Sequence, residues 1–325
     1  MPPTWRLWGF AMPMFDRMVT VLVGLPGGEG VQLDEAFHIA FNLKRTGGTS
    51  ANEGTVTISG LADTTINKMQ QPGTVCIVKG GYRQDHGPVT FYSGSVMRLE
   101  QVPDDTEDNV TLFLMDSVIP LRDAKISGSF PPNTSALKIL DYVSGQFGLP
   151  VRKNLKIADR QMVRPFAYNG RARNAMNEIC QFLGLEWSAQ ANEIQIIKKG
   201  DVYSDIAVVL SSETGLIGSP KPKAKNIPEK GAGKKGIKYG QDGVIRFTKT
   251  DPTAKVKDRQ MLQVQGYTVR SLLNPMIYPG SLIQLYSRGV NGKFFRVEEC
   301  TYSGDTESGL FVDAEIREIG NSDDK

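Results

Sequence analysis

Apolar and polar residues alternate over much of the first third of the chain, and this two-residue period is that of a β-strand. Residues 18–24 (MVTVLVG) and 54–61 (GTVTISGL) show the pattern, and turn formers such as PGGEG separate such runs. One short helix is expected at 62–70, capped by Asp63 or Thr64. The spacing favours a β-barrel or sandwich. Similar runs predict further strands at 37–45, 74–82, 89–99 and 109–117.

The period changes to that of a helix between about 134 and 199. Thr134 or Ser135 caps a first predicted helix, which Gly148 ends. A second helix is clearer and stops at Gly184. A hairpin follows, LEWSA and EIQIIKK around QAN, so this region reads as a small α/β insert. The apolar positions of the second helix recur at helical spacing and are Ala172, Ala175, Met176, Ile179, Cys180 and Leu183.

Strand patterns return after Asp201 and surround a stretch with two prolines, SLLNPMIYPGSLIQL at 271–285. Pro275 and Pro279 exclude a helix or a central strand, and Pro279-Gly280 suits a tight turn from which alternation begins. We interpret the stretch as a barrel corner that sets the register of the next strand. The expected strands are 205–210, 243–248, 259–267, 281–287, 293–303 and 311–319.

The predicted fold class is mainly β with an α/β insert, in which two barrel modules flank a small helix-containing domain. A chain of 325 residues is long enough for such a division into domains. The expected parts are an N-terminal arm 1–17, a first barrel 18–124, an α/β insert 125–200, a second barrel 201–320 and a tail 321–325.

Residues 219–240 carry seven lysines, one glutamate and almost no apolar side chains. Such a segment is expected to be a long solvated loop that binds an acidic protein partner. Within this segment no aromatic residue precedes Tyr239, so a stacking platform for single-stranded nucleic acid is not indicated. The candidate partner-binding residues are Lys221, Lys223, Lys225, Lys230, Lys234, Lys235 and Lys238.

Composition adds little to this picture. The formal net charge of +3 gives no general basic field, and no apolar run approaches the roughly 20 residues that span a bilayer, so we expect no membrane insertion. Cys76, Cys180 and Cys300 are far apart and are interpreted as reduced, structural thiols. The first residues lack the pattern of a signal peptide, which predicts synthesis and folding in a cytoplasm.

The motifs of catalysis are missing from the sequence. GAGKKG at 231–236 matches a dinucleotide fingerprint but follows a lysine-rich segment where a buried strand is required. His38 lies in a strand pattern and His86 in a predicted loop, without metal-protease spacing. Neither a phosphate-binding loop nor a G-x-S-x-G motif occurs. We therefore expect no enzyme activity, no cofactor and no metal.

The order of the motifs resembles that of phage tail and baseplate hub proteins. The residues that carry the resemblance are FHIAFNLKRTGGTSANEGTVTISGLADTTINKM, then VCIVKGGY and VTFYSGSV, with Gly80 where the family usually has alanine. In the later half, SETGLIGSP at 211–219, SLLNPMIYPGSLIQL and GKFFRVEECTYSGDTESGLFVDAEI resemble the second barrel of the family. The resemblance spans roughly 18–319.

The resemblance implies a structural virion protein, a homotrimer whose two tube-like barrels per chain give six similar domains in a ring. Such a ring would join the six-fold tail tube above to a three-fold spike below, and it could contact baseplate wedge and tape-measure proteins. DNA could pass its channel without sequence-specific binding, and assembly would take place in the host bacterial cytoplasm. Two alternatives stay open: a receptor- or carbohydrate-binding tail protein, or a tail-associated cell-wall hydrolase.

Overall fold

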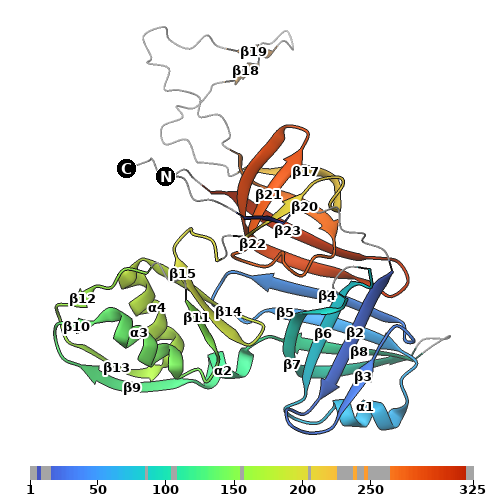
Figure 1. Ribbon diagram of the computed structural model, residues 1–325, viewed down its shortest axis with the longest axis horizontal. Helices are drawn as coiled ribbons and strands as arrows, with labels where there is room; N and C mark the ends of the chain where they lie inside the picture. Colours follow the sequence, from blue (N-terminus) through green and yellow to red (C-terminus); the bar gives the residue numbers. More distant parts are fainter. Residues whose placement is uncertain are drawn as a thin grey trace.

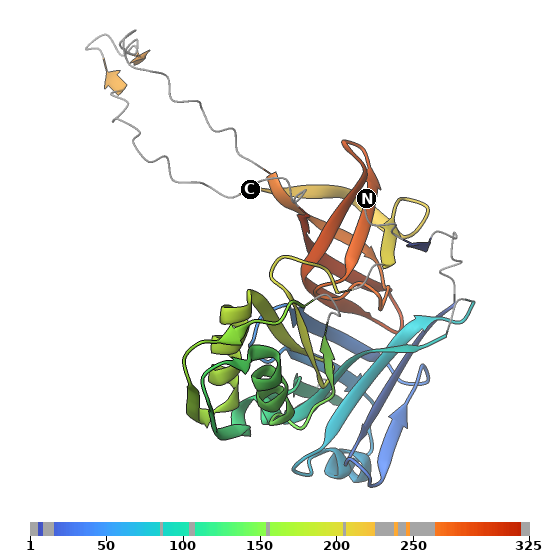
Figure 2. The ribbon, with the colours of Figure 1, turned by 60° about the vertical axis from the view of Figure 1, so that its left-hand side comes forward.

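The computed structural model describes residues 6–8, 16–84, 87–103, 108–153, 157–203, 206–224, 237–239, 245–247 and 264–319. These residues form a mainly β structure with four helices, as the sequence predicts. Two β modules lie one above the other, and a helix-containing insert lies to one side of the lower module (Figure 1). The same arrangement is visible after a rotation of 60° (Figure 2).

The first module consists of β2 Arg17–Gly24, β3 Gly30–Leu33, β4 Ile39–Thr46, β5 Glu53–Ser59, α1 Asp63–Met69, β6 Val75–Tyr82, β7 Val89–Pro103 and β8 Asp108–Met115. Its strands are ordered β4-β5-β8-β7-β6-β2-β3, each antiparallel to its neighbours. Every second side chain of β4 and β8 is buried, because alternate side chains point to opposite faces of a sheet.

The second module consists of β16 Ile206–Leu210, β17 Leu216–Ala224, β20 Val264–Leu272, β21 Leu282–Ser287, β22 Val290–Asp305 and β23 Leu310–Glu318. Its strands are ordered β17-β20-β23-β22-β21-β16, so they take the places of β4, β5, β8, β7, β6 and β2. The first five are antiparallel throughout, as in the first module. The repeat ends at β16, which runs parallel to β21.

The two longest strands share a further feature. The pairing of β7 with β8 shifts between Val96 and Arg98, and that of β22 with β23 shifts between Val297 and Glu299. A β-bulge thus inserts one residue, Met97 or Glu298, near the middle of each strand. Before the bulge the strand pairs with β6 or β21, and after it that edge is released.

The two modules are joined by a strand pair. Beyond its bulge, residues 299–305 of β22 pair antiparallel with residues 46–40 of β4. This joint makes one continuous antiparallel layer of eight strands, in the order β17-β20-β23-β22-β4-β5-β8-β7. The layer therefore has β17 at one end and β7 at the other, as the vertical sequence of strands in Figure 1 shows.

One hydrophobic core extends through both modules across this joint. The ring centroids of Phe91 on β7 and Tyr302 on β22 lie 4.9 Å apart, and both side chains are buried. Burial of aromatic side chains supplies much of the stability of such a core. The modules are therefore packed together as one unit.

The insert has a separate core. Its helices confirm the predicted ones: Ser135 Oγ accepts a hydrogen bond from the backbone of Lys138 at 3.2 Å, and Gly184 ends the second helix with φ +69°. The first helix ends at Gly145, three residues before the predicted Gly148. Leu121, which our division places in the first barrel, packs into this core. The elements are α2 Val118–Asp123, β9 Lys125–Phe130, β10 Thr134–Ser135, α3 Ala136–Gly145, β11 Val151–Lys153, β12 Gln161–Met162, β13 Phe166–Arg171, α4 Ala172–Leu183, β14 Leu185–Gln190 and β15 Glu193–Lys198.

The corner at 274–280 is confirmed and takes the place that α1 has in the first module. Asn274 closes it, because its side chain accepts from the backbone of Met276 at 2.9 Å. Gly280 has φ +88° and donates its N–H to Val297 at 2.8 Å, so the chain enters β21 in register with β22. The Tyr302 hydroxyl donates to the Ile277 carbonyl and fixes the corner to the core.

The structure corrects three expectations. Residues 219–224 are not loop but the end of β17, since prolines are tolerated in an edge strand. The helix α1 begins after Ala62, without a side-chain cap from Asp63 or Thr64. Within the N-terminal arm, β1 Arg6–Trp8 pairs with β16, so this part of the arm belongs to the second module. Two further short strands, β18 Ile237–Tyr239 and β19 Ile245–Phe247, pair with each other.

Candidate partner-binding surface

The structure places two of the seven candidate lysines together on an edge strand. Lys221 and Lys223 are exposed on β17, and Lys223 forms an ion pair with Glu315 of β23. Lys238 lies in β18, where only the backbone is described. The remaining four, Lys225, Lys230, Lys234 and Lys235, lie outside the described residues, as does the GAGKKG motif.

The outer edge of β17 has few hydrogen-bond donors. Lys221 lies opposite Thr268 of β20, and along one antiparallel edge every second residue bonds to the same neighbour. The N–H of Leu272 donates to Gly215 at 2.9 Å, which fixes the phase of this ladder. Because β20 is regular, its even-numbered residues face β17, so Lys221 bonds to β20 and Pro222 faces away from it, where its missing N–H removes no ladder bond. Pro220 lies in the register shift between Ile217 and Lys221. At Pro222 the outer edge of β17 therefore offers a carbonyl acceptor but no N–H donor.

The opposite end of the layer, β7, is also open along its second half. Beyond the bulge it pairs with β8 alone within the described part of the chain. Met97 at the bulge is 47% exposed. Arg98 lies 4.0 Å over the ring of Phe113 and forms an ion pair of 2.5 Å with Glu100. This edge therefore presents polar side chains on one face and unpaired backbone groups.

A buried polar cluster attaches the insert to the first module. Asp116, which follows β8, accepts hydrogen bonds from the backbone N–H of Ala191 at 2.7 Å and of Asn192 at 3.2 Å. These two residues form the β14–β15 turn and have positive φ, as its conformation requires. Burial raises the pKa of Asp116, while the hydrogen bond from Ser117 acts in the opposite direction. The turn is thus held by a buried carboxylate.

Arg45 and Gln190 complete this cluster. The Arg45 side chain, 6% exposed, donates to Gln190 Oε1 at 3.0 Å and to the Phe91 carbonyl at 3.1 Å. Asn52 accepts from the backbone of Thr46 at 2.8 Å. The ends of β4, β5 and β8 therefore all contact the tip of the β14–β15 hairpin, which makes the attachment rigid.

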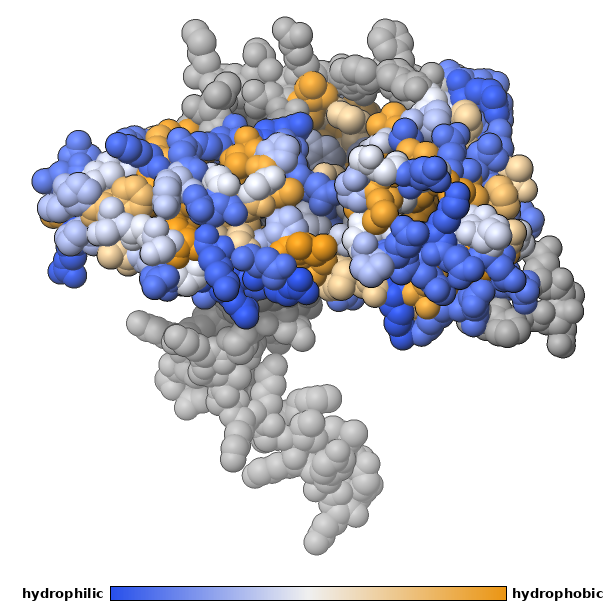
Figure 3. Space-filling model, turned by 90° about the horizontal axis from the view of Figure 1, so that it is seen from below, coloured by the Kyte–Doolittle hydropathy of each residue, from blue (hydrophilic) through white to orange (hydrophobic). Residues whose placement is uncertain are grey.

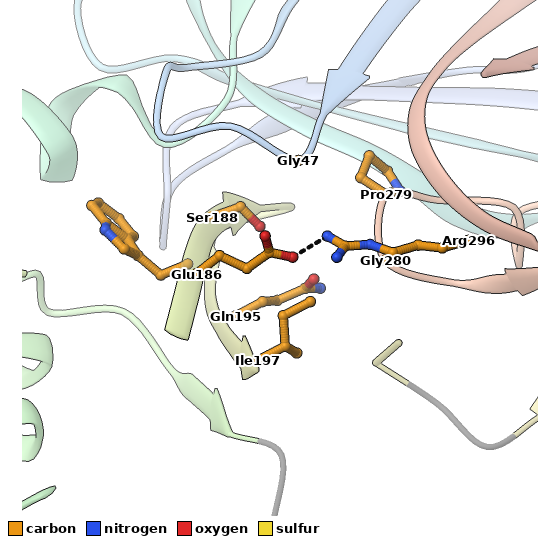
Figure 4. Close-up of a pocket in the computed structure, with 9 residues that line it drawn as sticks. Gly47, Glu186, Ser188, Gln195, Ile197, Pro279, Gly280 and Arg296 are labelled. Carbon is orange, nitrogen blue, oxygen red and sulfur yellow. Dashed lines mark ion pairs between the residues drawn. The ribbon is translucent and has the colours of Figure 1, made fainter. Parts of the chain in front are cut away.

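A second contact joins the insert to the second module. Glu186 of β14 forms an ion pair with the buried Arg296 of β22, beside the Pro279-Gly280 corner (Figure 4). The cavity at this place has a volume of about 10 Å³. That volume holds at most one water molecule, so this cavity does not accommodate a substrate.

Groups that could hold a metal ion do not gather in the described residues. His38 contacts Ser59 Oγ at 3.5 Å, and His86 lies outside the described residues. Within the described ranges there is no group of three or more His, Cys, Asp or Glu residues that could hold a metal ion, and no helix is long and apolar enough to cross a membrane. The three cysteines are free and buried: Cys76, Cys180 and Cys300.

The underside of the molecule shows no single large apolar patch. In Figure 3 small apolar groups are scattered among hydrophilic side chains over the insert and the first module. Isolated apolar residues are normal on a protein surface. The two ends of the eight-strand layer, rather than an apolar face, are the candidate sites of contact. Sequence reasoning missed the β7 end, because a strand pattern does not show which edge is left unpaired.

No protein-family model and no curated protein sequence matches the chain. A tail protein from Neisseria meningitidis MC58 matches with a TM-score of 0.59 and 11% identity, over 94% of this chain and 98% of its own. The 43 kDa tail protein of prophage MuSo2 from Shewanella oneidensis matches with a TM-score of 0.57 and 11% identity, over 93% of this chain and 98% of its own.

A third match extends beyond phages. The Escherichia coli c3393 protein is described as a component of the type VI secretion system with structural similarity to the T4 bacteriophage tail proteins gp27 and gp5. It has a TM-score of 0.52 and 10% identity, over 87% of this chain and 74% of its own. At such identities the likeness is one of fold. The chain therefore has the fold shared by phage tail proteins and this secretion component, as its motifs imply.

Proposed function

We propose that this chain is a structural tail protein, the trimeric hub that joins a six-fold tail tube to a three-fold spike. The observation that carries the proposal is the internal repeat, in which two modules of the same strand order are joined edge to edge. Three copies supply six such modules, and a closed cyclic ring needs only one further kind of joint. The hub would therefore present near six-fold symmetry to the tube and three-fold symmetry to the spike.

The fold shared with phage tail proteins supports a place in the virion, after assembly in the host bacterial cytoplasm. The partners in this proposal are the tail tube protein, the spike protein and, at the periphery, wedge or tape-measure proteins. DNA would pass through the ring without sequence-specific contacts. The lysines of 219–240 would bind acidic side chains of a protein neighbour by charge-assisted hydrogen bonds.

The insert would lie outside the ring. It has its own core and is attached through the ends of β4, β5 and β8 and through the Glu186–Arg296 ion pair to β22. These attachments involve neither β7 nor β17, so both ends of the layer stay free for neighbours. It would also bring a separate surface to the periphery of the hub.

The proposal is tested by light scattering coupled to size-exclusion chromatography, over a range of protein concentrations. We expect a species with the mass of three chains of 35.7 kDa, favoured at high concentration. A protein that stays monomeric at every concentration, alone and with a co-expressed spike protein, would argue against a hub. A dimer would also contradict it, because two copies supply only four modules.

A further inference from the structure

We propose that neighbouring copies are joined by antiparallel pairing of β7 from one copy with β17 from the next, in the register of the β22–β4 joint inside the chain. The proposal rests on the ring-forming hub described above and names the strands that close it. Glu100 of one copy would then face Lys223 of the next.

The internal repeat supplies the first reason. In the strand order, β7 has the place of β22, and β17 has the place of β4. The joint inside the chain connects β22 to β4, so the corresponding joint between copies connects β7 to β17. These are the two ends of the eight-strand layer, and within the described ranges neither has a partner on its outer edge. Repeating one joint therefore continues the layer from copy to copy.

The register follows from the facing residues. In each module, the residue just before the bulge lies opposite a residue of the next strand, and such facing pairs form a row that can be followed from strand to strand. In the first module the row leads from β7 through β8 and β5 to β4, and in the second from β22 through β23 and β20 to β17. Corresponding members of the two rows take equivalent places, so Pro222 corresponds to Leu43 and Lys223 to Lys44. The rows are Val96, Leu114, Gly54 and Leu43 in the first module and Val297, Ile316, Tyr267 and Pro222 in the second.

The residues of β7 and β22 are matched by counting from the bulge in each strand. Glu100 corresponds to Thr301, which lies opposite Lys44 in the joint. Glu100 of one copy therefore lies opposite Lys223 of the next. The charges of Glu100 and Lys223 are complementary. The ion pair of the joint itself, Lys44 with Glu299 at 2.7 Å, is not repeated, because Glu299 corresponds to Arg98; Glu100 supplies the acidic group instead.

Exposure agrees with this assignment. Leu43 and Tyr302, which face each other in the joint, are both 0% exposed. Their equivalents on the free edges, Pro222 and Gln101, are exposed. A neighbouring copy placed in the same register covers both positions.

The prolines make the joint between copies weaker than the joint inside the chain. Hydrogen bonds from Gly47 to Glu298 and from Thr306 to Ile39 show that Leu43 and Tyr302 form a hydrogen-bonded pair. At the equivalent position, the Gln101 N–H can donate to the Pro222 carbonyl, but Pro222 has no N–H to return. The chain can thus fold first and close into a ring afterwards, because its free edges are poor templates for uncontrolled strand pairing.

A disulfide between copies tests the register. Glu100 and Lys223 take the place of a non-hydrogen-bonded pair, where Cα atoms are about 4.5 Å apart and a disulfide is allowed. Oxidation of the Glu100→Cys, Lys223→Cys double variant should give covalent trimers on a non-reducing gel. An equal mixture of the two single variants should give covalent dimers and nothing larger, because each copy then carries one half of one joint.

The matched control shifts one cysteine by two residues. The Glu100→Cys, Lys221→Cys variant places the cysteines diagonally, about 7–8 Å apart, and should give at least tenfold less covalent trimer. Equal yields from the two double variants would overturn the register. A trimer by light scattering without any covalent product from Glu100→Cys, Lys223→Cys would overturn this joint and leave the hub intact. The absence of both trimer and covalent product would contradict the hub as well.

Discussion

Lys44 on β4 and Glu299 on β22 form an ion pair of 2.7 Å across the strand pair that joins the two modules. The hydrogen bond with Glu299 raises the pKa of Lys44, so the lysine keeps its charge in the joint. Half of the Lys44 side chain is exposed, and exposed ion pairs contribute little to stability. The joint is therefore held by its backbone ladder and by the core beneath it, whereas the ion pair favours its register.

The first prediction separates these contributions. Tyr302→Ala should lower the free energy of unfolding by about 3–5 kcal/mol, because it removes a fully buried ring and the hydroxyl that donates to Ile277. Lys44→Ala should cost about 1 kcal/mol or less. Urea unfolding measures both. Equal losses for the two variants would show that the ion pair, and not the core, holds the modules together.

The second prediction concerns the pH dependence of the insert's attachment. The pKa of Asp116 is raised by burial, so the folded state binds a proton more tightly than the unfolded state. Its contribution to stability is therefore greatest at low pH and is lost as the pH rises through the folded-state pKa. Between about pH 7 and about pH 4 the wild type should gain stability relative to Asp116→Asn. A loss of stability relative to Asp116→Asn over this pH range, or no change, would contradict the raised pKa of Asp116.

The third prediction uses two glycines with open space around them. Gly184 ends α4 with φ +69°, whereas Gly145 closes α3 without a positive φ, and an added Cβ would meet no atom within 4 Å at either. Gly184→Ala should cost about 1 kcal/mol through backbone strain alone. Gly145→Ala should leave the thermal midpoint unchanged or raise it. Calorimetry that gave the same loss for both would rule out the strain argument.

The fourth prediction concerns the buried thiols. Burial raises the pKa of Cys76 and Cys180 to about 12 and that of Cys300 to about 11. Because the thiolate is the reactive form, the native protein should resist iodoacetamide at about pH 8. Mass spectrometry should find three alkylated sites after denaturation. Rapid alkylation of the folded protein at any of them would mean that its surroundings open readily.

Much of the fold could be predicted because its signals are local. Alternation along 18–24 and helical spacing up to Gly184 depend only on near neighbours, and both were confirmed. Residues 219–224 show the limit of such reasoning: their lysines and lack of apolar side chains favoured a loop, but an edge strand tolerates a proline such as Pro222 where its missing N–H faces outward. Whether an edge is free depends on the whole sheet.

The candidate sites depend on partners that are distant in the sequence. β4 and β22 pair across more than 250 residues, and neither strand has a sequence pattern that identifies the other as its partner. Asp116 likewise holds a turn some 75 residues away, and its importance becomes visible only with its burial. The sequence could therefore indicate two β modules, whereas the joint between them, and the free edges equivalent to it, required the structure.

The central claim is that three copies close into a ring of six similar modules. Electron microscopy of the purified protein at high concentration tests it most directly, with class averages viewed along the ring axis. We expect closed rings with six similar inner lobes around a channel and three additional lobes outside, formed by the insert. Open filaments, or compact particles without a channel, would contradict the account.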